Sequence, residues 1–212
     1  MFSLEINAGA PAPITSLPEP PYVFEKGTLI TAEVDWNKDS IKKFISSDIK
    51  LDEVVNGGIE VFFTKHKKPL DKINYVLIWL NLQNDYKRLV LGFVGPNYDS
   101  NRIIEKISEK KLTLAKSRIM IINEKVSSRT NINNKLSFNI SGNINTNCTK
   151  NKNKLNKIEI SKSKTFSITH KSDSVCNLDI TSITFAENYS DLKVNKILNA
   201  SIFKSAEVTF SY

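Results

Sequence analysis

The sequence predicts an α+β fold that is mainly antiparallel β-structure, arranged as a curved or cone-like barrel with two or three short helices. Most of the chain alternates polar and apolar residues at a period of two, which is typical of strands with one buried face. The stretches of helical period are short and do not alternate regularly with the strands, which argues against a parallel α/β sheet. With 212 residues, the chain is long enough to bury one sizeable core.

Proline separates the beginning of the sequence from the rest. Prolines at positions 11, 13, 18, 20 and 21 predict that residues 1–21 form an extended arm. The strand and helix patterns begin directly after it. Residues 22–212 are therefore expected to form a single domain.

The first part of this domain is expected to hold two strands, at 22–24 and 28–34, joined by a turn at Lys26-Gly27. A short amphipathic helix over 35–47 follows, with Asp39 or Ser40 as its N-cap. Further strands are expected at 59–64, 75–82, 112–122, 135–144, 155–169, 178–185 and 206–212. Of these, the strand at 75–82 is the most apolar and is expected to lie in the interior of its sheet.

The turn-forming and helix-capping residues between these strands predict the remaining elements. Residues 92–96 (Gly-Phe-Val-Gly-Pro) predict a turn, after which Asp99 or Ser100 caps a second helix with Ile103, Ile104 and Ile107 along one face. A third short helix is expected near 192–198. The Asn- and Lys-rich segment 126–164 is either loop or the product of a biased composition.

The net charge of +8 is concentrated in one part of the chain. Residues 102–171 hold 16 Lys and Arg against 4 acidic residues, a local balance of +12. A basic half of this kind is compatible with nucleic acid, with an anionic substrate or with a solvated lysine-rich surface. Proteins that bind single strands place aromatic residues among the basic ones, but Phe138 is the only aromatic between 102 and 165. The sequence therefore argues against a nucleic-acid partner.

The length of the apolar runs, the two cysteines and the missing motifs indicate the expected compartment and cofactors. The apolar runs fall far short of the 18 to 20 residues that a membrane helix needs, and no secretory leader is visible, so a cytoplasmic protein without a membrane partner is expected. Cys148 and Cys176 lie in dissimilar polar surroundings and are expected to be unpaired. No metal-binding spacing or nucleotide-binding motif occurs, so neither a metal nor another cofactor is predicted.

Lysine chemistry is the catalytic possibility that the sequence leaves open. The common hydrolase and metalloenzyme motifs are missing, and the two histidines, His66 and His170, each stand beside lysine in polar sequence and are expected at the surface. An amine becomes a nucleophile when burial or a neighbouring cation lowers its pKa. Lys110 and Lys111 are such an adjacent pair.

Patterns at both ends of the domain are similar to those of a known family. The first is Pro21-Tyr22-Val23-Phe24 followed by the segments 29–34, 39–45 and 49–52, and the second is made of the segments 181–185, 191–198 and 206–210. Together they resemble the opening and closing segments of the acetoacetate decarboxylase family. The resemblance covers about half of the chain and rests on hydrophobic and turn positions.

The resemblance implies a β-rich, cone-like barrel around an apolar cavity, homo-oligomeric assembly and decarboxylation through a Schiff-base lysine. One alignment places Lys110 as the nucleophile and Lys111 as the perturbing cation, and Glu105 or Glu109 is then a candidate carboxylate partner. A second places residues 87–93 on the family's helix end, with Gly95-Pro96 where the family has its lysines. Under either alignment, Tyr75 and Trp79 lie in a strand that lines the cavity or belongs to the core.

Three functions follow from these observations. The first is a carbon-carbon lyase, decarboxylase-like, that acts on a small β-keto acid or a related carbonyl compound. The second is a member of the same fold that binds a small ligand and has lost the lysine chemistry. The third is a basic nucleic-acid-binding module, which the scarcity of aromatic residues disfavours. The spacing of Glu105, Glu109, Lys106 and Lys110 also suits a solvated helix face with Glu-to-Lys pairs, which is the alternative to a catalytic role.

Overall fold

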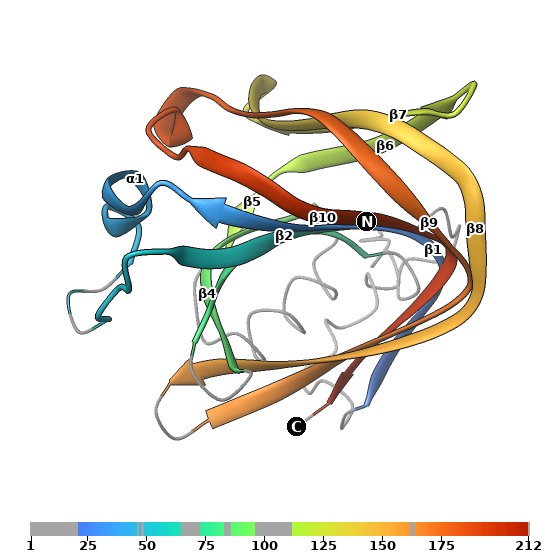
Figure 1. The fold of residues 1–212 in the computed structure, drawn as a ribbon, viewed down its shortest axis with the longest axis horizontal. Helices are drawn as coiled ribbons and strands as arrows, with labels where there is room; N and C mark the ends of the chain where they lie inside the picture. The colour runs from blue at the N-terminus through green and yellow to red at the C-terminus, as the bar shows by residue number, and fades with distance from the viewer. Residues whose placement is uncertain are drawn as a thin grey trace, which may run out of the picture.

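A computed structural model describes residues 21–45, 47, 49–64, 73–82, 86–95, 112–161 and 164–211. In these residues ten strands form one curved sheet, in the order β5-β4-β3-β2-β1-β10-β9-β8-β7-β6 (Figure 1). The strands are β1 (Tyr22–Trp36), β2 (Val55–Thr64), β3 (Asn74–Asn81), β4 (Tyr86–Val94), β5 (Thr113–Leu114), β6 (Lys116–Ile122), β7 (Lys125–Ile132), β8 (Lys135–Ser161), β9 (Lys164–Phe185) and β10 (Val194–Ser211). The expected arm at 1–21 lies outside the described residues, apart from Pro21.

The pairing is mainly antiparallel and the sheet is curved, as predicted, but in the described residues the sheet does not close into the cone-like barrel that was the other expected form. Among the described residues, the edge strands β5 and β6 do not pair with each other. β4 instead forms short parallel pairs with β5 and with the far half of β8, so the sheet is mixed. The parallel contact between β4 and β8 covers three residues and connects two strands that lie far apart in the sheet order.

β1 is one long strand, not the two strands and turn that the sequence predicted. It pairs with β10 on one side and with β2 on the other. Lys26 has a positive φ of 55°, and the register with β10 shifts on both sides of Gly27. The Lys26-Gly27 dipeptide therefore produces a bulge that bends the strand without ending it.

Two apolar clusters lie against opposite faces of the sheet. β3 contributes to both because its side chains alternate, with Val76, Ile78 and Leu80 in the first cluster and Tyr75, Leu77 and Trp79 in the second. The first cluster also contains Trp36 and Phe138, and the second contains Phe62 and Phe210. The prediction that the most apolar strand lies in the interior is confirmed, because β3 is buried on both faces.

The two longest strands, β8 and β9, form a bent hairpin (Figure 1). Of the two strands, β9 contributes described residues to both clusters. Cys176 of β9 belongs to the first cluster, while its neighbour Val175 belongs to the second. The register of the hairpin shifts at Ser141/Gly142 and again between Ile144 and Cys148, which allows so long a ladder to bend. The Asn- and Lys-rich segment is thus mostly strand rather than loop.

Cys148 and Cys176 form a disulfide, so the prediction that they are unpaired is wrong. They are 28 residues apart in sequence but lie directly opposite each other in the β8–β9 ladder. Sequence spacing did not reveal this pairing because the register shift before Cys148 cannot be read from local patterns. Disulfides are typical of oxidising compartments, so the cysteines no longer support a reducing one.

The helices are shorter than expected. The first, α1 (Lys38–Lys42), begins after Asn37, which is the N-cap in place of Asp39 or Ser40. The helix expected near 192–198 is wrong, because Glu187–Tyr189 form a 3-10 turn and β10 begins at Val194. The helix expected after Asp99 lies outside the described residues. Among those described, no helix is long and apolar enough to cross a membrane.

Other boundaries also differ from the expected ones. The turn expected at 92–96 is wrong, because β4 continues through Gly92 to Val94. Gly92 packs closely under Leu112, since an added Cβ would lie 2.6 Å from a Leu112 methyl carbon and would force that side chain to shift. The strand expected at 112–122 is divided into β5 and β6 at Ala115.

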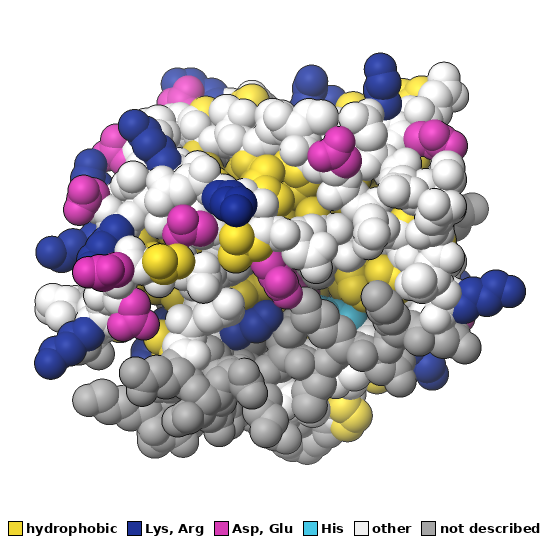
Figure 2. All heavy atoms as spheres, in the orientation of Figure 1, with side chains coloured by type: hydrophobic (Ala, Val, Ile, Leu, Met, Phe, Trp, Pro, Cys, Tyr) yellow, Lys and Arg dark blue, Asp and Glu magenta, His cyan; other side chains and the backbone are white. Residues whose placement is uncertain are grey.

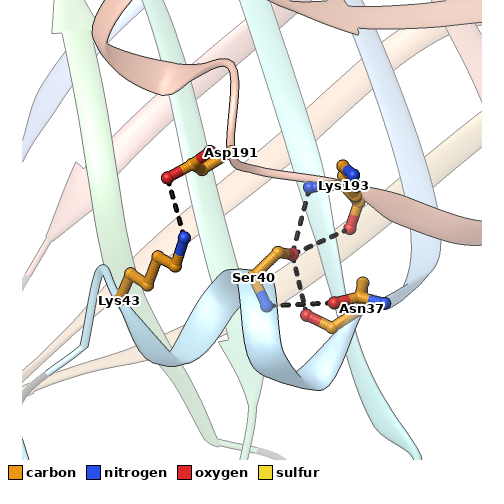
Figure 3. A network of polar contacts seen from close by, with 5 residues as sticks. All are labelled: Asn37, Ser40, Lys43, Asp191 and Lys193. Atoms are coloured by element: carbon orange, nitrogen blue, oxygen red, sulfur yellow. Dashed lines mark hydrogen bonds and ion pairs between the residues drawn. The ribbon is translucent and has the colours of Figure 1, made fainter.

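A polar network attaches α1 to the segment that leads into β10 (Figure 3). The Asn37 side chain accepts a hydrogen bond from the Ser40 backbone N–H at 3.0 Å, which caps the helix. The Ser40 hydroxyl accepts from the Lys193 N–H at 3.1 Å. An exposed ion pair joins Lys43 to Asp191 at 2.8 Å, and its hydrogen bond lowers the pKa of the Asp191 carboxyl. The network positions the helix, and its surface ion pair adds little stability.

Candidate functional site

Three ionisable side chains meet in the second apolar cluster. Glu60 of β2, Tyr75 of β3 and His170 of β9 are each at most 1 % exposed. Glu60 Oε1 accepts a hydrogen bond from the Tyr75 hydroxyl at 2.5 Å, and His170 Nε2 lies 2.9 Å from the same oxygen. Such a group is costly to bury unless its members satisfy one another. We call Glu60, Tyr75 and His170 the interior triad.

The sheet brings these residues together in two different ways. Tyr75 and Glu60 are diagonal neighbours on adjacent strands, because Glu60 pairs with Leu77 and Phe62 pairs with Tyr75. His170 comes from much farther away, since β1 and β10 lie between β2 and β9 in the sheet. Its contact with Glu60 therefore crosses the interior of the curved sheet.

Aromatic side chains enclose the interior triad. The Tyr75 ring lies 5.5 Å from that of Phe62 and 5.9 Å from that of Phe210, and the His170 ring lies 6.3 Å from that of Phe203. These apolar neighbours keep water away from the carboxylate and strengthen its interactions with the other two residues. The arrangement has the characteristics of a functional site, namely titratable groups held close together in an apolar interior.

The electrostatics of the triad keep Glu60 ionised and Tyr75 neutral. Burial alone would raise the pKa of Glu60, but the charge of His170 and the hydrogen bonds from His170 and Tyr75 outweigh it, so the pKa is lowered. Burial raises the pKa of Tyr75 well above its usual value, and the charge of Glu60 raises it further. Glu60 is thus an anionic acceptor, and the neutral Tyr75 hydroxyl donates a hydrogen bond to it.

These shifts predict how stability depends on pH. Because the folded-state pKa of Glu60 is lowered, its contribution is present above the ordinary value of about 4.5 and is lost as the pH falls below that value. Because the pKa of Tyr75 is raised, its contribution is present below about 10.0 and is lost as the pH rises above that value. Denaturant unfolding measured across pH should show both losses. A Tyr75→Phe variant that kept the full alkaline loss would contradict the assignment of that loss to Tyr75.

Two more polar side chains lie close to the interior triad. The Lys87 Nζ of β4 lies 4.5 Å from the centre of the Trp79 ring, and its charge also lowers the pKa of Glu60. Trp79 lies over Gly58, where an added Cβ would come within 2.6 Å of the ring. The glycine therefore lets the indole lie flat against β2, diagonally next to Glu60.

The site residues predicted from sequence are not among those that the structure describes. Lys110, Lys111, Glu105 and His66 all lie outside the described residues, so their roles stay predictions. For His170 the prediction of a surface position is wrong, because its side chain is fully buried against Glu60. Tyr75 and Trp79 were expected in a cavity wall or in the core, and both lie in the second cluster.

Sequence reasoning overlooked Glu60, although a signal was present. Glu60 is the single charged residue in the apolar run Ile59–Phe63, and its alternation places it on the face of Phe62 rather than in solvent. His170 likewise alternates with the buried Ile168 and Ser172. An inward-facing charge in a strand is the pattern that identifies both residues.

Comparison with known proteins gives a fold but no close relative. No family model matches the sequence, and no curated protein matches it. Solved structures do match. Acetoacetate decarboxylase from Legionella pneumophila aligns over 98 % of this chain and 92 % of its own, with a TM-score of 0.63 and 13 % identity. The chain has the acetoacetate decarboxylase-like fold.

Two further solved structures with the acetoacetate decarboxylase-like fold also match this chain. Another acetoacetate decarboxylase structure aligns over 92 % of this chain and 88 % of its own, with a TM-score of 0.61 and 12 % identity. The enduracididine biosynthesis enzyme MppR, complexed with pyruvate, aligns over 92 % of this chain and 89 % of its own, with a TM-score of 0.59 and 8 % identity. The resemblance predicted from the two ends of the domain is therefore confirmed at the level of fold.

Proposed function

We propose that this protein binds a small carbonyl compound beside the interior triad and acts on it as a decarboxylase-like lyase. The observation that carries the proposal is the buried Glu60, held ionised by His170 and Tyr75 inside an aromatic enclosure. A triad of this kind provides proton donors and an acceptor where water is excluded. Structures with the same fold include acetoacetate decarboxylases and an enzyme complexed with pyruvate, which supports a carbonyl ligand.

Lys110 is the proposed nucleophile, with Lys111 as the neighbouring cation that lowers its pKa. The amine of Lys110 attacks the ketone carbonyl of a β-keto acid, and water leaves to form an iminium. The bond to the carboxylate carbon then breaks, its electron pair moves towards the iminium nitrogen, and carbon dioxide departs. A proton returns to the carbon, and water hydrolyses the iminium to release the ketone and restore the amine. Glu105 is proposed as a carboxylate partner for these proton transfers.

Borohydride reduction in the presence of acetoacetate tests this proposal. The iminium would be reduced to a stable secondary amine, and peptide mass spectrometry should find the added mass on the peptide that contains Lys110. A Lys110→Arg variant should lose the label, while Lys125→Arg, on the exposed part of β7, should keep it. If the wild-type protein acquires no label, the Schiff-base mechanism is wrong.

A ligand-binding protein without lysine chemistry is the second candidate. The interior triad supports it because Glu60, Tyr75 and His170 satisfy one another without any residue of the lysine pair. Under this alternative acetoacetate binds reversibly, carbon dioxide is not released and borohydride gives no label. A nucleic-acid partner has less support, since acidic side chains lie among the basic ones on the face shown in Figure 2.

A further inference from the structure

An open groove lies at the β6 end of the sheet. It has a volume of about 710 Å³ and takes its lining from β6, β7, β8 and β9. Lys125, Ser127 and Arg129 of β7 line it and alternate with the buried Val126 and Ser128, so their side chains point away from the first cluster. No member of the interior triad lines this groove, which is therefore separate from the carbonyl site proposed above.

Two arginines lie directly opposite each other at one end of the groove. Arg118 of β6 pairs with Arg129 of β7 in the ladder, and both side chains are exposed. Like charges opposite each other on neighbouring strands are destabilising. Neither arginine forms an ion pair or a side-chain hydrogen bond within the described part of the chain. An anion between the two guanidinium groups would replace this repulsion with charge-assisted hydrogen bonds.

A third cation lies farther along the same strand. Lys125 is four residues from Arg129, a separation of about 14 Å in a β-strand. The acidic residues Glu124 and Asp179 lie at the lysine end, which leaves the arginine end the more cationic. The groove thus offers two cationic positions along its length, and the stronger is the arginine pair.

Neutral polar side chains fill the space between these cations. Ser127 pairs with Ser141 of β8, and Asn139 connects their hydroxyls: Ser127 Oγ donates to Asn139 Oδ1 at 3.4 Å, and Asn139 Nδ2 donates to Ser141 Oγ at 3.2 Å. In this chain Ser141 accepts, so its own proton can be donated to a ligand, and hydroxyls can both donate and accept. These groups match a ligand that carries hydroxyls between its acidic groups.

The lining of the groove disfavours a nucleic acid. None of the described residues that line it is aromatic, so a nucleobase would find no ring on which to stack. A fully apolar chain would leave the serine hydroxyls without partners. Charge and hydroxyl groups together are the chemistry that this groove can satisfy.

We propose that the groove binds an acidic oligosaccharide, in which sulfate or carboxylate groups alternate with free hydroxyls. One acidic group lies between Arg118 and Arg129, a second reaches Lys125, and sugar hydroxyls pair with Ser127 and Ser141. This inference goes beyond the proposed function, because it concerns another surface and another class of ligand and involves no covalent step.

Calorimetry with a heparin-derived hexasaccharide at about 0.15 M salt tests the proposal. The wild-type protein should bind the probe. The double variant Arg118→Gln/Arg129→Gln should raise the dissociation constant by about tenfold or more, as expected for the loss of hydrogen bonds to charged groups. The control Lys42→Gln/Lys204→Gln removes the same net charge from exposed positions on α1 and β10 and should raise it by less than about twofold, because distant charges are screened.

Two measurements separate recognition from folding. The double arginine variant relieves a like-charge contact, so its midpoint in denaturant should not fall below that of the wild-type protein. Ser141→Ala keeps every charge and should weaken hexasaccharide binding severalfold while leaving any binding of hexaglutamate unchanged. Unchanged hexasaccharide binding by Ser141→Ala would show that the hydroxyls take no part.

Three other results would overturn the proposal. The first is equal weakening by the two double variants, which would mean that net charge alone attracts the ligand. The second is binding of hexaglutamate or of a deoxythymidylate hexamer as tight as that of the hexasaccharide, since neither offers the hydroxyls of a sugar chain. The third is no binding of the hexasaccharide at all. None of these results bears on the carbonyl site, which the borohydride experiment tests separately.

Discussion

Replacing Glu60 with leucine is expected to lower the free energy of unfolding by about 3 to 5 kcal/mol, because it removes the common partner of two buried polar groups. The Tyr75 hydroxyl and the His170 imidazole both contact Glu60 Oε1, and both side chains are fully buried. Leucine has a similar volume but offers no acceptor. Chemical denaturation of the purified variant measures the loss.

Two further variants make this prediction specific. Glu53→Gln replaces an exposed glutamate two residues before β2 begins at Val55, and it should change the free energy of unfolding by less than about 0.5 kcal/mol. Combining Glu60→Leu with Tyr75→Phe and His170→Leu removes the unsatisfied groups and should recover much of the loss, since apolar replacements of buried ionic groups are often well tolerated. A cost below about 1 kcal/mol for Glu60→Leu alone would contradict the burial and pairing of the triad.

Reduction of the Cys148–Cys176 disulfide is expected to cost about 3 to 4 kcal/mol, the chain-entropy value for a closed loop of 28 residues. The oxidised and reduced forms of the wild-type protein are compared by denaturant unfolding with and without dithiothreitol, so no side chain is changed. Cys148 is exposed, which gives the reductant access, whereas Cys176 is fully buried.

The control for this comparison is a Cys148→Ser variant, which should unfold at the same denaturant concentration in both buffers. Mass spectrometry after alkylation under non-reducing conditions should find both cysteines protected in the oxidised wild-type protein. Two alkylated cysteines in the protein as purified would show that the disulfide does not form under those conditions.

The sequence was sufficient to predict the fold family and the interior position of β3. Both follow from local patterns, namely the hydrophobic and turn positions at the ends of the domain and the continuous apolar run of 75–80. Strand boundaries were less accurate where a bulge interrupts the pattern. Lys26-Gly27 has the composition of a turn, yet β1 continues through it as a bulge, because Gly27 pairs with both β2 and β10.

The candidate site was not predicted because its parts meet through tertiary structure. Glu60 and His170 are 110 residues apart and lie on strands separated by two others, so only the curvature of the sheet brings them into contact. Cys148 and Cys176 became neighbours through a register shift that no local pattern encodes. The sequence marks Glu60 and His170 as unusual for their strands, but in both the triad and the disulfide the partner becomes visible only in three dimensions.

The pairing of β1 with β10 has a consequence for how the protein folds. Twelve register pairs join these two strands, from Tyr22 with Phe210 to Trp36 with Val194, although more than 150 residues separate them in sequence. During synthesis β1 can pair with β2 early, but its other edge stays open until β10 has left the ribosome. Folding should therefore be slow, and the exposed edge of β1 should make the nascent chain depend on protection from aggregation.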